Sequence, residues 1–297
     1  MLQDLRGIIP ALATPLRADG SVDVDGMARL VDYVVEGGVK GLFVLSSTGE
    51  GPMLREEDKE VAVRTAVEAA AGRVAILVHI PDTSTARVIR QAEKAAELGA
   101  DYVVSTLPFY FRHAGAQTMS FYTDVAEESP RPVMIYNVPY CTGVQVTAEE
   151  IAELAAHPNI VGIKDSTQDW RHFQQVIRVK DSVPEFMVYN GDEEALASTV
   201  LMGGDGGVLG LANVAPRLCV DLFEAADRGD VARARKLQAK LAELQDIWTM
   251  AECGHGGLKL ALSVLGICEP HVTRPLIPPS PDLEPRMLRL LRQHGLI

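Results

Sequence analysis

Cysteine is scarce in this sequence, and its placement excludes two kinds of framework. The chain has four cysteines, and no two of them form a CxxC pair. Scattered cysteines are typical of reduced thiols and give no metal framework. Cys253 and His255 lie close together, but two ligands without partners are a weak signal for zinc. We therefore expect no metal. The cysteines are Cys141, Cys219, Cys253 and Cys268.

Basic charge and long apolar runs are also lacking. The 28 lysines and arginines are outnumbered by 40 aspartates and glutamates, which gives a formal net charge of −12. Without a basic patch to displace counterions, a nucleic-acid partner is not expected. No apolar run reaches the roughly 18 residues of a membrane span, and residues 1–6 do not resemble a secretory leader. We expect a cytoplasmic protein with no membrane partner.

What the sequence does contain is enough apolar material for a sizeable core. Apolar residues make up 47% of the 297 residues and charged residues 23%, a balance typical of soluble proteins. One pattern recurs along the chain: an amphipathic helix, a turn of small residues, then a short apolar strand. It is seen over residues 27–45, 86–105 and 194–211. Glycine just past each helix supplies the cap that turns the chain back into a strand.

Eight strands can be placed, and most are continuous runs rich in Val, Ile and Leu. Such runs are typical of a parallel sheet covered on both faces. Eight of them with helices between predict a (β/α)8 TIM barrel. A doubly wound sheet is the alternative, and the absence of a Gly-rich fingerprint after the first strand weighs against it. The predicted strands are Gly7–Leu12, Gly41–Leu45, Ala75–Ile80, Tyr102–Thr106, Val133–Asn137, Ile160–Lys164, Phe186–Asn190 and Gly207–Leu211.

The pattern becomes wholly helical after the eighth strand. Helices are expected over Pro216–Arg228, Val231–Cys253, Gly257–Leu265 and Pro285–Gln293. This tail is too long to be the eighth barrel helix alone. We therefore expect residues 1–215 to form the barrel core and residues 216–297 to form the last barrel helix and a C-terminal helical subdomain.

The most informative stretch is residues 159–166, an apolar run that ends in Lys164. An ammonium group held against an apolar strand has a lowered pKa, and its neutral amine becomes available as a nucleophile. Such an amine can condense with a carbonyl to form a Schiff base. The alternative is a lysine that simply leaves the strand for water.

In a (β/α)8 barrel the chemistry lies where the strands run out into loops, and several polar residues stand there. Each has a structural alternative: a capping turn for Ser47 and Thr48, a core aromatic for Tyr136, an acidic first helical turn for Glu193 and Glu194. Their occurrence at the ends of separate strands favours one shared site. The strand-end residues are Ser47, Thr48, Tyr110, Tyr136, Lys164, Gly191, Glu193, Glu194 and Val208.

Several of these residues lie in motifs that resemble the pyruvate-dependent class I aldolases of the dihydrodipicolinate synthase and N-acetylneuraminate lyase type. The motifs are Ser47-Thr48-Gly49-Glu50, Tyr136-Asn137-Val138-Pro139, Gly162-Ile163-Lys164-Asp165 and the glycine-rich residues 203–207. The resemblance spans essentially the whole chain. It implies that Lys164 forms an imine with the keto carbon of pyruvate. With this covalent lysine imine, the resemblance implies no organic cofactor either.

The same resemblance implies roles for further residues. Tyr136 matches the tyrosine that donates and accepts protons at the imine, and Ser47 matches a hydroxyl that relays the proton. Thr48 and the N–H groups of its turn match the cradle for the pyruvate carboxylate. Tyr110 matches a tyrosine that reaches across a dimer interface, which implies a homo-oligomer, often a dimer of dimers. Val208 matches an apolar residue whose backbone lines the pyruvate site.

Departures from the family pattern concern the second substrate. Members that make dihydrodipicolinate carry an arginine where this chain has Cys141, and a thiol cannot form its bidentate contact with a carboxylate. Glu193 and Glu194, after Gly191, lie in register with the acidic pair that holds sugar hydroxyls in neuraminate lyases. The serine that those lyases use after strand eight is Gly210 here.

The sequence thus predicts a Schiff-base aldolase or lyase, a carbon–carbon lyase that cleaves or forms a 2-keto acid from pyruvate and an aldehyde. A 2-keto-3-deoxy sugar acid or a related acid is the expected substrate. The alternatives are a 4-hydroxy-tetrahydrodipicolinate synthase, a sugar-acid dehydratase that uses the same imine, and a family member that only binds a keto acid. An intact set of Lys164, Tyr136 and Ser47 speaks against the last.

Overall fold

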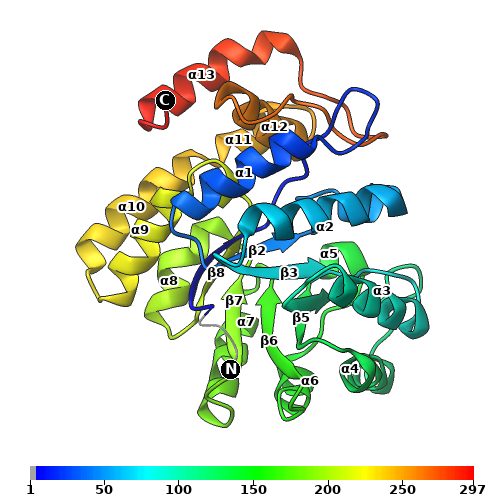
Figure 1. Cartoon of the computed structure of the whole chain (residues 1–297). Coiled ribbons are helices and arrows are strands. Elements are labelled where there is room, and N and C mark those ends of the chain that lie inside the picture. Colours follow the sequence, from blue (N-terminus) through cyan, green and yellow to red (C-terminus); the bar gives the residue numbers. More distant parts are fainter. Residues whose placement is uncertain (1–4) are drawn as a thin grey trace.

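The computed structural model describes residues 5–297 and contains one sheet of eight parallel strands (Figure 1). The strands pair in the order β1-β8-β7-β6-β5-β4-β3-β2. A bridge between Ala11 and Phe43 joins the first strand to the second and closes the ring. The predicted (β/α)8 barrel is therefore confirmed. The strands are β1 (Gly7–Pro10), β2 (Gly41–Val44), β3 (Ala75–His79), β4 (Tyr102–Ser105), β5 (Val133–Asn137), β6 (Ile160–Asp165), β7 (Met187–Asn190) and β8 (Gly206–Leu209).

Helices follow the strands and cover the outside of the barrel. Most present one apolar face to the strands. For example, α1 buries Leu30, Val31 and Val34. Burial of each of these side chains stabilises the fold by about 1.5–3 kcal/mol. The helices are α1 (Val24–Glu36), α2 (Glu56–Ala70), α3 (Thr85–Glu97), α4 (Ala116–Glu128), α5 (Pro139–Thr142), α6 (Ala148–Leu154), α7 (Trp170–Ile177), α8 (Leu196–Leu201), α9 (Pro216–Asp227), α10 (Val231–Glu243), α11 (Asp246–Met250), α12 (Gly254–Val264) and α13 (Glu284–Gln293).

Two sets of buried side chains follow from the period-two alternation of the strands. One set points outward and packs against the helices, as Val44, Ile76 and Ile135 do. The other fills the barrel interior and includes Phe43 and Tyr136. Residues that alternate with the outward set thus face the interior, and Lys164 is one of them.

The helical tail differs from the sequence-based expectation in one respect. The single helix predicted over Val231–Cys253 is two helices, α10 and α11, with a turn at residues 244–245. Leu241, Leu244, Ile247 and Met250 are all buried. Residues spaced three apart drift around a straight helix, which has 3.6 residues per turn, and do not stay on one face. The chain therefore turns between the two helices, and all four side chains remain buried.

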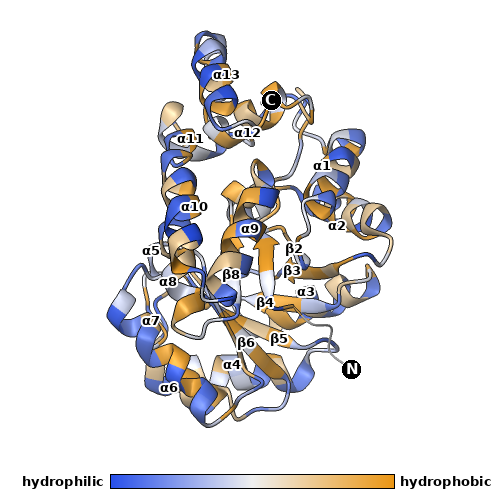
Figure 2. Cartoon of the chain, turned by 90° about the vertical axis from the view of Figure 1, so that its left-hand side faces the viewer, coloured by the Kyte–Doolittle hydropathy of each residue, from blue (hydrophilic) through white to orange (hydrophobic). Residues whose placement is uncertain are grey.

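Figure 1 shows α11 to α13 gathered at one end of the molecule, whereas α10 lies beside α9. In Figure 2 most strands carry the colours of apolar residues, whereas α13 is largely hydrophilic on its outside. Within residues 5–297 no helix is long and apolar enough to cross a membrane. The described part of the chain also contains no group of three or more His, Cys, Asp and Glu side chains that could hold a metal ion.

Candidate active site

Lys164 lies near the carboxyl end of β6 and points into the barrel, where it is only 4% exposed. Its Nζ lies 4.3 Å from the centre of the Tyr136 ring and 5.0 Å from that of Phe43. Burial lowers the pKa of Lys164 to about 7, although nearby Glu193 and Cys141 act in the opposite direction. A large fraction of this amine is therefore neutral and nucleophilic near neutral pH.

Tyr136 and Ser47 extend a line of polar groups from the lysine. Lys164 Nζ donates a hydrogen bond to the Tyr136 hydroxyl at 3.3 Å, and that hydroxyl lies 3.1 Å from Ser47 Oγ. Parallel pairing of β5 and β6 places Tyr136 directly opposite Lys164. Burial raises the pKa of Tyr136, so its hydroxyl keeps its proton and can donate it. The three groups can pass a proton between a bound substrate and the edge of the site.

The loop after β2 holds Ser47 and Thr48 in a tight conformation. Leu45 and Glu50 at its two ends have φ angles of 61° and 58°, values that residues other than glycine rarely adopt. The backbone N–H groups of Ser47 and Thr48 bond to no acceptor in the described part of the chain. Strain and free N–H groups of this kind are common where a loop receives an anion. The loop is thus suited to bind a carboxylate beside the lysine.

Gly191 and Val208 shape the space around the lysine. A Cβ atom on Gly191 would lie 2.0 Å from Ser166 Oγ and 3.1 Å from Lys164 Cε. Only glycine therefore lets the loop after β7 pass so close to the lysine. Val208 on β8 is buried in the barrel interior, in the same cluster of side chains as Phe43 and Tyr136.

The structure separates the two glutamates that the sequence places together. Glu193 is buried, and its Oε1 accepts hydrogen bonds from the N–H groups of Gly210 (2.9 Å) and Leu211 (3.0 Å). Glu194 is exposed and lines a separate cavity of about 320 Å³ with Asp192 and Trp170. Of the two glutamates, only Glu193 acts on the charge of Lys164.

Cys141 lies on α5 and is exposed at the mouth. It is close enough to influence the charges of both Lys164 and Tyr136. Its neighbour Tyr140 is 70% exposed, but its hydroxyl interacts with that of Tyr136. The thiol is therefore an exposed group close to both Lys164 and Tyr136.

Tyr110 is not part of this cluster within one chain. It lies in the loop after β4, is 76% exposed, and its ring contacts Phe111 with centroids 5.0 Å apart. Phe109 and Phe111 beside it are also exposed. Its side chain is free to contact another molecule.

The helical tail contributes residues that the sequence did not reveal as parts of the site. His255 Nε2, at the start of α12, donates to the Ser47 carbonyl at 2.9 Å across 208 positions of sequence. Trp248 fills the space beside Gly210, where a Cβ atom would lie 2.3 Å from its ring. No local pattern marks such contacts, since they depend on how α11 and α12 pack over the mouth.

His79 at the end of β3 is a second residue that the sequence analysis did not single out. Its ring packs edge-on against Tyr136 and Phe43, and its Nδ1 lies 3.2 Å from the carbonyl of Leu45. Burial lowers the pKa of His79 to about 3, so the ring is neutral. It supports the strained loop without adding charge beneath Lys164.

The barrel and the groups at its mouth define an enzyme whose chemistry lies at the carboxyl ends of the strands. Comparison with known proteins gives the family: the model of the dihydrodipicolinate synthetase family matches residues 4–294, and the chain belongs to this family.

Relatives cover nearly the full length. The 4-hydroxy-tetrahydrodipicolinate synthase of Neisseria meningitidis serogroup B is 33% identical over 292 residues, which are 98% of this chain and 99% of the relative. A probable 2-dehydro-3-deoxy-D-pentonate aldolase of Escherichia coli K12, YjhH, is 31% identical over 299 residues, covering 100% of this chain and 99% of the relative.

The solved structure of YagE, a prophage protein of the dihydrodipicolinic acid synthase family from Escherichia coli K12, in complex with pyruvate, superposes with a TM-score of 0.93. It is 32% identical and covers 98% of this chain and 99% of its own. Because the named relatives are synthases and aldolases, the protein is a carbon–carbon lyase of the aldolase type.

Proposed function

We propose that this protein is a Schiff-base aldolase that cleaves a 2-keto-3-deoxy sugar acid into pyruvate and a hydroxylated aldehyde. The observation that carries the proposal is the chain of hydrogen-bond contacts from Lys164 through Tyr136 to Ser47. The pKa of this lysine is lowered to about 7. Neutral amine and protonated phenol are the two states that imine formation needs at once.

The proposed reaction starts with attack of the neutral Lys164 amine on the keto carbon of the substrate. Water leaves as Tyr136 and Ser47 move protons, and a protonated imine remains on the lysine. Tyr136, which has given its proton to the departing water, takes the proton of the C4 hydroxyl. The C3–C4 bond breaks, its electron pair moves into the imine to give an enamine, and the aldehyde leaves. Protonation of C3 and hydrolysis release pyruvate and restore the amine.

The substrate carboxylate is assigned to the loop after β2. The N–H groups of Ser47 and Thr48 have no other acceptor in residues 5–297, and they lie beside the Ser47 hydroxyl that contacts Tyr136. A carboxylate held there would place the adjacent keto carbon toward Lys164. Such positioning removes much of the entropic cost of bringing two reactants together.

The nature of the second substrate is inferred from Cys141 and Glu193, the two residues near Lys164 that are not assigned to pyruvate. Cys141 offers no positive charge to an aldehyde that carries a carboxylate. Glu193 Oε1 is held by backbone N–H groups, and the carboxylate is proposed to accept a hydrogen bond from a substrate hydroxyl. A neutral, hydroxylated aldehyde suits this pair of residues.

The relatives leave a second candidate, a 4-hydroxy-tetrahydrodipicolinate synthase, because curated relatives carry that name. The two candidates are separated by comparing kcat/KM for cleavage of 2-keto-3-deoxy sugar acids with that for condensation of pyruvate and aspartate semialdehyde. We expect the sugar acids to be preferred. A preference for the semialdehyde would reject our assignment.

A substitution at Cys141 sharpens this test. Cys141→Arg introduces a guanidinium at the mouth and is expected to raise kcat/KM for the carboxylate-bearing semialdehyde by about tenfold or more, the worth of a charge-assisted contact. Cys141→Ser is the matched control, because it keeps the size without adding charge. Equal effects of both variants would show that charge at this position does not select the aldehyde.

The proposal has two further parts. The reaction uses no metal or organic cofactor, so activity is expected to survive exhaustive EDTA treatment. The active form is a homo-oligomer, a dimer of dimers, in which the exposed Tyr110 of one chain completes the site of another. A strict requirement for an added divalent metal would contradict the first part.

A further inference from the structure

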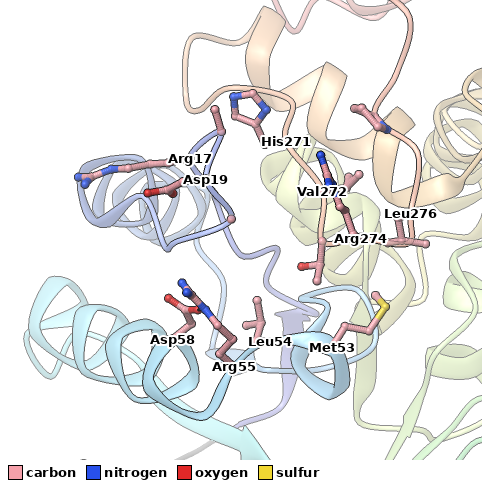
Figure 3. A pocket seen from close by; sticks show the side chains of 14 residues that line it. Arg17, Asp19, Met53, Leu54, Arg55, Asp58, His271, Val272, Arg274 and Leu276 are labelled. Atoms are coloured by element: carbon pink, nitrogen blue, oxygen red, sulfur yellow. The ribbon is translucent and has the colours of Figure 1, made fainter.

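A second cavity, of about 600 Å³, lies apart from the residues of the active site. Figure 3 shows it between three segments: the loop that carries Arg17 and Asp19, the start of α2 with Arg55 and Asp58, and the chain that follows α12 from His271 to Pro278. Its volume lies within the range of small-molecule sites.

The walls of this cavity have an excess of positive charge. Three arginines face two carboxylates, and both carboxylates already have partners. Asp58 accepts from Arg55 at 2.5 Å, and Asp19 accepts from the N–H and hydroxyl of Ser21. Arg17 and Arg274 form no ion pair within residues 5–297. In a chain with a net charge of −12, this is a local reversal of sign.

The rest of the lining is apolar, with one unpartnered polar atom. Met53, Leu54 and Leu276 line the cavity beside the arginines. The hydroxyl of Thr273, which also lines it, is buried and has no hydrogen-bond partner in the described residues. Buried polar groups rarely lack a partner, so a shift of residues 271–273 on ligand binding would let this hydroxyl gain a hydrogen bond.

The cavity wall is bonded to the active-site loop. Glu50 ends that loop, and its side chain is 0% exposed. One carboxylate oxygen forms an ion pair with the buried Lys259 at 2.7 Å, and the other accepts the N–H of Thr273 at 2.5 Å. Lys259 in turn donates to the carbonyl of His271 at 2.8 Å. Residues 271–273 therefore cannot shift without acting on Glu50, three positions after Ser47.

We propose that this cavity binds a small organic dianion, a phosphate ester or dicarboxylate, and that its binding changes the rate at which the active-site loop supports catalysis. Arg17 and Arg274 hold the charges, and the apolar wall holds the carbon skeleton. The signal passes through Thr273 and His271 to Glu50. The effect on rate rests on the proposed function, whereas the binding does not.

The binding test is calorimetry on the full chain with glycerol 3-phosphate, succinate and malate as probes, in the presence of saturating pyruvate to occupy the active site. At least one probe is expected to bind the unmodified protein. Arg274→Gln and Arg17→Gln are each expected to weaken that binding about tenfold. The matched control is Arg233→Gln, which removes an exposed arginine from α10, away from the cavity.

Two outcomes would overturn the site: none of the three probes binds, or binding is the same in the Arg17, Arg274 and Arg233 variants. The effect on catalysis is read from the rate at which borohydride traps pyruvate on the protein, with and without the probe that binds. We expect a change of rate that Arg274→Gln abolishes. Binding without any change in that rate would reject the coupling, and failure to trap pyruvate at all would reject the proposed function instead.

Discussion

At the scale of single residues, the proposed chemistry depends on the burial of Lys164. An exposed lysine is almost wholly protonated near neutral pH, whereas this side chain is 4% exposed and lies against the faces of two aromatic rings. Phe43 and Tyr136 can partly stabilise an ammonium ion, but they do not replace its water. The net result is a pKa lowered to about 7.

The lowered pKa gives a direct prediction for pH. Imine formation needs the neutral amine, so its rate should rise with pH, reach half its maximum near pH 7 and level off above about pH 8. At pH 6 about a tenth of the amine is neutral. The measurement is the initial rate of borohydride trapping with pyruvate between pH 5.5 and 9.5. A rate that continues to climb through pH 9 would indicate a lysine with an ordinary pKa.

Tyr136 gives a second prediction at this scale. Tyr136→Phe removes the hydroxyl that lies between Lys164 and Ser47 and leaves the ring against Phe43. We expect kcat to fall about 10²- to 10⁴-fold, as for loss of a general acid, with little change in KM for the substrate. Steady-state kinetics provide the test, and Tyr102→Phe on β4 is a control for loss of a buried phenol. An unchanged kcat would remove Tyr136 from proton transfer.

At the scale of elements, the loop after β2 is held by a helix more than 200 positions away. Lys259 on α12 is 1% exposed and pairs with Glu50, which is 0% exposed. A buried ion pair adds little stability by itself, but removing one partner leaves an uncompensated charge in the interior. His255 on the same helix bonds to the carbonyl of Ser47. The tail therefore fixes the geometry of the site.

This arrangement predicts an asymmetry between single and double variants. Lys259→Met should lower the free energy of unfolding by about 3–5 kcal/mol, because Glu50 then remains buried without a counter-charge. Adding Glu50→Gln should recover much of that loss. Urea unfolding of the two variants measures the difference. A double variant no more stable than Lys259→Met would show that the loss comes from packing and not from charge.

The elements also show what sequence alone can predict. Runs such as residues 133–137 are continuous and apolar, and each observed strand lies within two residues of its predicted bounds. The break between α10 and α11 was missed, because it serves the packing of Ile247 and Met250 and no proline or glycine marks it.

At the scale of the whole molecule, the barrel explains why Lys164, Tyr136 and Ser47 could be predicted together. The carboxyl ends of parallel strands lie at the same end of the barrel. Residues at the ends of different strands are therefore close together in space. The different placement of Glu193 and Glu194 could not be predicted, since it depends on how one turn after β7 directs two neighbouring side chains. Contacts from the tail, such as that of His255, depend on packing over long sequence distances.

The whole molecule is also the scale of the proposed oligomer. Tyr110, Phe109 and Phe111 form an exposed aromatic group on one loop. Apolar groups of this kind commonly mark an interface. The site of a single chain lacks Tyr110, so a full site is proposed to require a second copy.

The most direct test of the account is the mass of the intact protein after incubation with pyruvate and borohydride. We predict one stable pyruvyl adduct per chain, mapping to Lys164 after proteolysis and absent from Lys164→Met. Untreated protein and protein without borohydride are the controls. A folded protein that forms no adduct, or an adduct on another lysine, would contradict the central claim that Lys164 is the nucleophile.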